Sequence, residues 1–126
     1  MIRSSKLERD AFNDIKLLLD YSHLLYKEYL KSNKKFIYSS ILRKVNKKLY
    51  ECLSKNYFHL TDKTHNDAIE LMFHLDVWMA IWDHEYEEQR PKLWDIFTFN
   101  NDITFPRDNV KNLLKYFAEY RDKVDQ

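Results

Sequence analysis

The sequence predicts an all-α protein, a single domain over residues 1–126 that resembles a four-helix bundle. Three observations lead to this fold class. The chain contains no glycine, where an average protein of this length has about nine. Apolar residues recur at helical spacing in four segments, which are separated by short polar stretches. Hydrophobic residues make up 44% of the chain and aromatic residues 16%, enough for one core in a domain of this size.

The absence of glycine also excludes several function classes. A Rossmann fingerprint, a P-loop, a nucleophile elbow and a glycine-rich kinase loop each need glycine, either for a positive φ or for close approach of the backbone to a ligand. A turn-rich β-sandwich is disfavoured for the same reason. The chain therefore lacks much of the usual equipment for catalysis, and no catalytic residue is expected.

The first two helices are predicted over about Lys6 to Ser32 and about Phe36 to Lys55. A capping box formed by Ser5 and Glu8 would start the first helix. The two helices are separated by a polar break at residues 32–35. The apolar or small residues that recur at helical spacing are Leu7, Ala11, Ile15, Leu18, Ser22, Leu25 and Tyr29 in the first helix, and Ile37, Ile41, Val45, Leu49, Cys52 and Leu53 in the second.

The third helix is predicted to begin near Asp62 or Thr64 and to end before Pro91, because the residue before a proline disfavours the α conformation. Thr64 and Asp67 have the spacing of a capping box. Pro106 fits the first turn of a fourth helix. Between these helices, residues 92–105 form an irregular, aromatic-rich loop. A packed loop with a helical turn at 92–97 is favoured there, with a short hairpin around residues 100–102 as the alternative.

Charge is divided unevenly along the chain, although the formal net charge is only +1. Residues 1–60 hold 13 Lys or Arg and 6 Asp or Glu, a net charge of +7. Residues 61–105 hold 3 Lys or Arg and 10 Asp or Glu, a net charge of −7. A basic half and an acidic half indicate either internal pairing or two distinct binding faces.

The end of the third helix carries the candidate binding site, an acidic segment with aromatic residues. Acidic side chains at a helix C-terminus oppose the helix dipole, so their presence there calls for a reason. A surface for a basic partner supplies one, with aromatic side chains as anchors and carboxylates around them. In the alternative, the tryptophans are core and the acids form a solvated face or pair with the basic second helix. The candidate residues are Asp76, Trp82, Asp83, Glu85, Tyr86, Glu87 and Glu88.

Two other functions remain open. A metal-dependent helical-bundle enzyme would use His74, His84 and nearby carboxylates, but their spacing does not supply the three or four ligands of a zinc site. A nucleic-acid-binding regulator would use the basic residues Lys34, Lys35, Arg43, Lys44, Lys47 and Lys48. A solvated helical face is the favoured interpretation of that run. Cys52 is expected to be a small buried hydrophobe rather than a nucleophile. Neither a metal nor a cofactor is expected.

The segment Trp82-Asp83-His84-Glu85-Tyr86-Glu87-Glu88, with the size and composition of the chain, resembles bacterial immunity proteins of the contact-dependent growth-inhibition and colicin types. The resemblance implies a cytoplasmic, non-catalytic protein. It would bind one cognate toxin domain in a 1:1 complex and block its active site or its substrate surface. A nuclease toxin would be basic, because its substrate is a polyanion. The single cysteine and the polar N-terminus agree with the cytoplasm. No membrane partner is expected, nucleic acid is disfavoured, and the oligomeric state is left open.

Overall fold

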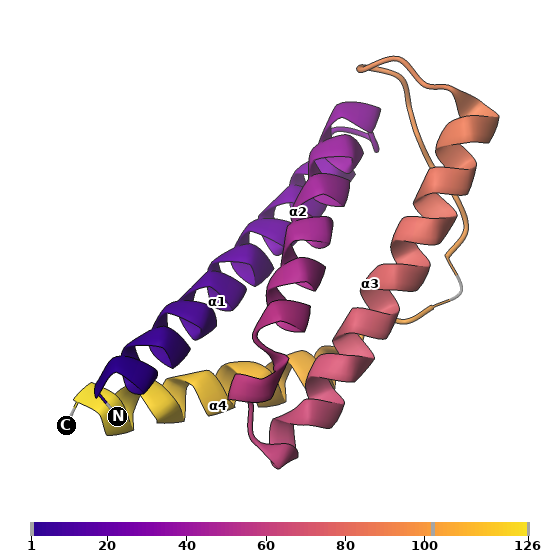
Figure 1. Cartoon of the computed structure of the whole chain (residues 1–126). Helices are drawn as coiled ribbons and strands as arrows, with labels where there is room; N and C mark the ends of the chain where they lie inside the picture. The colour runs from indigo at the N-terminus through magenta and orange to yellow at the C-terminus, as the bar shows by residue number, and fades with distance from the viewer. Residues whose placement is uncertain (1, 102, 126) are drawn as a thin grey trace.

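The structure, a computed structural model, describes residues 2–101 and 103–125. It confirms the all-α prediction (Figure 1). The elements, in chain order, are α1 (Ile2–Lys31), α2 (Phe36–Lys55), the short 3-10 helix η1 (Tyr57–His59), α3 (Asp62–Gln89) and α4 (Arg107–Asp125). Helices α1, α2 and α3 run lengthwise, with α2 packing against both of the others, and α4 lies across one end of the molecule (Figure 1).

One core joins all four helices. Its buried residues come from the inner face of each helix, with Ile15, Leu53, Leu71 and Leu113 fully enclosed. The predicted stripes are right only in part: Phe12, Leu19 and Leu42 are buried although the stripes omitted them, whereas Ile37, Ile41 and Cys52 are only partly buried. A second, aromatic cluster lies at the far end of the bundle from α4, where Phe36, Trp82 and Phe97 pack together. This cluster positions the acidic end of α3.

Among the described residues, three adopt left-handed backbone conformations that glycine normally occupies. Asn33 and Lys34, with φ of 62° and 60°, reverse the chain between α1 and α2. Arg90, with φ of 46°, ends α3, and its N–H donates to the Tyr86 carbonyl at 2.9 Å. A side chain in this region brings its Cβ close to the following carbonyl, which costs about 1 kcal/mol. Because the chain contains no glycine, its folded state carries this conformational cost at each of these positions.

Replacing Lys34 with glycine is therefore expected to raise the free energy of unfolding by up to about 1 kcal/mol, because glycine has no Cβ to clash. Urea denaturation followed by circular dichroism measures the change. Lys44→Gly is the matched control. It lies at an exposed position inside α2, where glycine should lower the same free energy by about 1 kcal/mol. Destabilisation of similar size in both variants would contradict the argument.

The segment between α3 and α4 is a packed loop, as the sequence favoured. The helical turn expected at 92–97 is reduced to one turn, in which the Asp95 N–H donates to the Lys92 carbonyl at 3.1 Å, and no helix forms there. Over its described residues it forms no hairpin. Its extended part instead pairs with the α1–α2 turn through an isolated bridge between Lys35 and Ile96. The Phe36 N–H donates to the Asp95 carbonyl at 2.8 Å, and the Phe97 N–H donates to the Lys34 carbonyl at 2.9 Å. The loop thus supplies acceptors to the first turn of α2, whose N-cap residue makes no side-chain capping bond.

Tyr29 links this loop to α1 through a hydrogen bond. Its hydroxyl donates to the Phe97 carbonyl at 2.5 Å. Burial of the phenol, assisted by the neighbouring Tyr26, raises the pKa of Tyr29 to about 12. The hydroxyl therefore stays protonated, and able to donate, at all moderate pH values.

Both capping boxes expected from the sequence are wrong. Helix α1 begins at Ile2, so Ser5 lies inside the helix rather than at its cap. Helix α3 begins at Asp62, and the Thr64 hydroxyl donates to the Thr61 carbonyl at 3.0 Å. Asp67 is buried and turned toward α4. Its carboxylate accepts hydrogen bonds from the side-chain amides of two α4 residues, Asn109 at 2.9 Å and Asn112 at 3.4 Å.

Candidate functional site

The acidic end of α3 is built on a stack of aromatic rings. Trp82 and Tyr86 are one helical turn apart, and their rings are 5.4 Å apart and nearly parallel, at 4°. Phe36, the first residue of α2, stacks with both, at 5.8 Å from Trp82 and 5.6 Å from Tyr86. Phe97 packs edge-on against Phe36 and Trp82. Two other parts of the chain, the start of α2 and the α3–α4 loop, therefore hold this end of α3 in place.

Trp82 belongs to this core and not to the exposed surface, which corrects its assignment as an exposed anchor. Only 7% of the residue is exposed. Its indole N–H donates to the Ser39 hydroxyl of α2 at 2.7 Å, so its polar atom has a partner inside the protein. Tyr86 is half-buried and remains accessible at the edge of the stack. Sequence periodicity alone did not separate these two roles, because both rings lie on the same side of α3.

Asp83 pairs with the basic second helix. The Arg43 guanidinium contacts both carboxylate oxygens, with Nε at 2.9 Å and the terminal nitrogen at 3.0 Å. The same guanidinium lies 5.8 Å from the centre of the Trp82 ring. Part of the opposition between the basic and acidic halves is thus satisfied within the chain. The Asp83 side chain is still 55% exposed, so the pair orients the carboxylate more than it stabilises the fold.

The three glutamates near the helix end have different surroundings. Glu85 accepts a hydrogen bond from the Gln89 amide at 3.0 Å, and that amide also donates to the Thr98 carbonyl, which ties the helix to the loop. Glu87 pairs with the Arg90 guanidinium. Glu88 is exposed. The last turn of α3 contains no basic residue, so these carboxylates lie at the negative end of the helix dipole. The C-cap residue Arg90 offsets this in part, because its guanidinium also donates to the Glu87 carbonyl at 3.3 Å.

Asp76 lies apart from the other candidate residues. It precedes Asp83 by seven positions, about 10 Å along the helix axis. Its charge raises the pKa of Tyr50 on α2. Asp76 therefore faces the middle of α2 rather than the acidic end of α3. We define the acidic surface as Asp83, Glu85, Glu87 and Glu88 together with Tyr86.

Within the part of the chain that the structure describes, no three His, Cys, Asp or Glu side chains are placed to share a metal ion. His84 is exposed. His74 is buried, and its ring meets the Phe105 ring edge-on at 5.3 Å. Its Nδ1 atom has no hydrogen-bond partner among the described residues. This histidine is a core residue next to the α3–α4 segment.

Burial lowers the pKa of His74. The unfolded chain takes up a proton at this histidine near pH 6.5, more readily than the folded protein does. The free energy of unfolding should therefore fall as the pH is lowered from about 7 to about 5. A His74→Leu variant should show a weaker fall, whereas His84→Leu, changed at an exposed position, should keep the wild-type fall. Urea denaturation at several pH values tests this, and identical pH profiles for all three proteins would count against it.

The basic residues do not form one continuous patch. Arg43 is engaged with Asp83, whereas Lys44, Lys47 and Lys48 are exposed along α2. Lys34 and Lys35 lie in and next to the α1–α2 turn, at the start of the helix. These lysines can contact phosphates, but they lie in two separate places, along α2 and at the α1–α2 turn.

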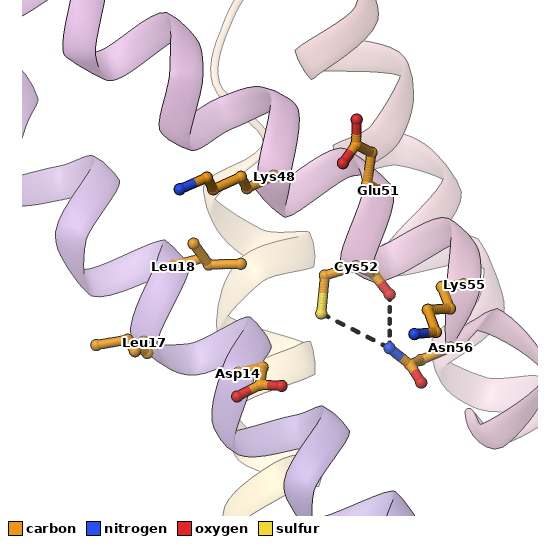
Figure 2. A pocket seen from close by; sticks show the side chains of 8 residues that line it. All are labelled: Asp14, Leu17, Leu18, Lys48, Glu51, Cys52, Lys55 and Asn56. Carbon is orange, nitrogen blue, oxygen red and sulfur yellow. Dashed lines mark hydrogen bonds between the residues drawn. The ribbon is translucent and has the colours of Figure 1, made fainter.

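A groove of about 430 Å³ lies between α1 and α2 (Figure 2). Asp14 and Glu51 contribute carboxylates to its lining, and Lys48 and Lys55 contribute ammonium groups. Cys52 is half-buried there, and burial, with the charge of Asp14, raises the pKa of its thiol. A thiol held in its protonated form is a poor nucleophile. Cys52 packs against the core but is only partly buried, and not the buried residue that the sequence predicted.

Comparisons with protein-family models, with curated proteins and with solved structures gave no match. Over the described residues, no helix is both long enough and apolar enough to cross a membrane.

Proposed function

We propose that this chain is an immunity protein, which binds a cognate basic toxin domain in the cytoplasm and neutralises it without catalysis. The observation that carries the proposal is the acidic surface at the end of α3. Asp83, Glu87 and Glu88 are exposed and Glu85 is half-buried, and the aromatic stack fixes the backbone beneath them. They lie at the helix end where their charges are least favourable for the isolated protein. A basic partner would remove this electrostatic cost on binding.

Rigidity and charge have separate roles in this proposal. The stack of Phe36, Trp82 and Tyr86 orders the surface before the partner arrives, which lowers the entropy lost on binding. The carboxylates attract a basic domain at long range and speed the encounter. Tyr86, half-buried at the edge, is the aromatic residue that contacts the partner. Trp82 does not contact the partner. It packs beneath the surface and holds Tyr86 and Asp83 in position.

Affinity capture tests the proposal. The purified protein serves as bait in an extract of its source organism, and mass spectrometry identifies what is retained. The expected result is one basic toxin domain, which binds 1:1 when purified and whose activity the chain inhibits. Recovery of nucleic acid would favour a regulator that uses the basic helix. Stoichiometric bound metal would favour the enzyme.

A charge-reversal series then tests the surface itself. The Glu85→Lys, Glu87→Lys and Glu88→Lys triple variant should weaken binding to that domain by about 100-fold or more, because like charges then face each other. The matched control reverses the exposed acids Asp20, Glu51 and Glu70, which changes the net charge equally. The control should lose far less affinity. Equal losses in both variants would show that only net charge matters, and unchanged affinity in the first would reject the acidic surface while the inhibitor role stood.

A further inference from the structure

Helix α1 has an apolar stripe on its outer side. Leu17 is 65% exposed, Tyr21 44% and Leu24 51%. The opposite side of the same helix supplies Phe12 and Ile15 to the core. Figure 2 shows Leu18 pointing from α1 toward α2, and Leu17 pointing away from it. The stripe therefore lies outside the core that α1 shares with the other helices.

The spacing of this stripe is that of a helix-packing surface. Leu17, Tyr21 and Leu24 are separated by four and then three residues, so they form a seam along one side of the helix over two turns. Large apolar side chains scattered singly over a surface are ordinary, but a continuous seam marks a contact. Asp14 precedes the seam by three residues, and Lys31 follows it by seven. Both continue the same spacing.

The charges beside the seam are complementary to those of an antiparallel copy of α1. Asp10 and Asp14 lie toward the N-terminus of the seam. Lys27 and Lys31 lie toward its C-terminus with one acid, Glu28, which pairs with Lys31 of the same helix at 3.7 Å. An antiparallel copy brings the acidic end of one helix against the basic end of the other. A parallel copy would set Asp14 against Asp14. The side chains of Asp10, Asp14, Lys27 and Lys31 are exposed, and Glu28 is half-buried.

We propose that two copies of the protein associate through antiparallel packing of α1 on α1. In this arrangement Tyr21 faces Leu24 of the partner subunit, Leu17 lies opposite Glu28 of the partner subunit, and Asp14 faces Lys31 of the partner subunit. The two-fold axis passes between residues 22 and 23. The contact is the same on both subunits, so it closes at a dimer and does not propagate into fibres.

The dimer does not depend on the immunity role. Helices α1 and α3 pack on different sides of α2 (Figure 1), so the association through α1 leaves the acidic surface of each subunit open. A dimer would then carry two partner sites that act independently. Failure of either proposal leaves the other standing, because oligomeric state and toxin binding are measured separately.

Sedimentation velocity of the intact protein, from about 1 to about 200 µM, tests the dimer. The expected mass at high concentration is twice the 15.6 kDa of one chain. A Tyr21→Lys and Leu24→Lys double variant should remain monomeric throughout, and its circular dichroism should match the wild type because both side chains are exposed. The control is Ile69→Lys with Phe73→Lys, at α3 positions that are 50% and 61% exposed. It should still dimerise. A wild-type monomer at every concentration, or loss of the dimer in the control as well, would overturn the proposal.

A charge swap tests the orientation of the two helices. Asp14→Lys and Lys31→Asp should each weaken the dimer about fivefold, and combining them should restore it, because each subunit then offers the reversed pair. Restoration supports the antiparallel arrangement. Additive weakening in the double variant would overturn it.

Discussion

Replacing Phe97 with alanine is expected to lower the free energy of unfolding by about 3–5 kcal/mol, the usual cost of truncating an enclosed phenylalanine. The side chain is fully buried although its segment contains no helix or strand. It packs edge-on against Phe36, Trp82 and Phe99. The substitution would leave a cavity between α2 and α3, and the neighbouring rings cannot fill it without abandoning their stack.

Urea denaturation measures this loss, and Trp94→Ala is the matched control. Trp94 is a larger aromatic residue only three positions away in the same loop, but it is 63% exposed. Its removal should change the free energy of unfolding by less than about 0.5 kcal/mol. Near-ultraviolet circular dichroism should change in Phe97→Ala, because the surroundings of Trp82 change with the stack. Equal effects of the two substitutions would mean that the loop is not packed as described.

The contrast between these two aromatic residues marks the limit of sequence reasoning for this fold. The helical spacing that predicted most of the inner helix faces does not exist in residues 92–105, where the apolar residues follow no regular spacing. Burial there is decided by the pairing of Lys35 with Ile96 and by the acceptors offered to α2. These contacts join positions about sixty residues apart. The spacing of residues within a short stretch of sequence cannot indicate such distant contacts.

The candidate site was predictable to a similar degree. The acidic and aromatic composition at the end of α3 could be read directly from the sequence. The burial of Trp82 and the pairing of Arg43 with Asp83 depend on how α2 and α3 are aligned along each other. The uneven distribution of charge indicated that some internal pairing was possible. It could not indicate which arginine would meet which carboxylate.

The attachment of α4 depends on a few aromatic contacts, and this gives the second large prediction. Over its described residues, α4 buries only Leu113 and Phe117 fully. Phe12 of α1 is 3% exposed and stacks on Phe117, with ring centres 4.5 Å apart. It also meets the rings of Tyr116 and Tyr120 edge-on, at 5.6 and 4.9 Å. One α1 side chain thus contacts three aromatic residues of α4.

Phe12→Ala is therefore expected to lower the free energy of unfolding by about 3–5 kcal/mol, with the earliest loss of structure in α4. Amide hydrogen exchange would detect this as faster exchange in α4 than in the middle of α2 and α3, because a helix that loses its packed face opens locally before the whole domain unfolds. Asn13→Ala, at the adjacent exposed position, is the control and should leave exchange in α4 unchanged. Uniformly faster exchange along the whole chain would instead show that α4 is part of one cooperative unit. The contact of Phe12 with Phe117 would then stabilise the domain as a whole rather than the docking of its last helix.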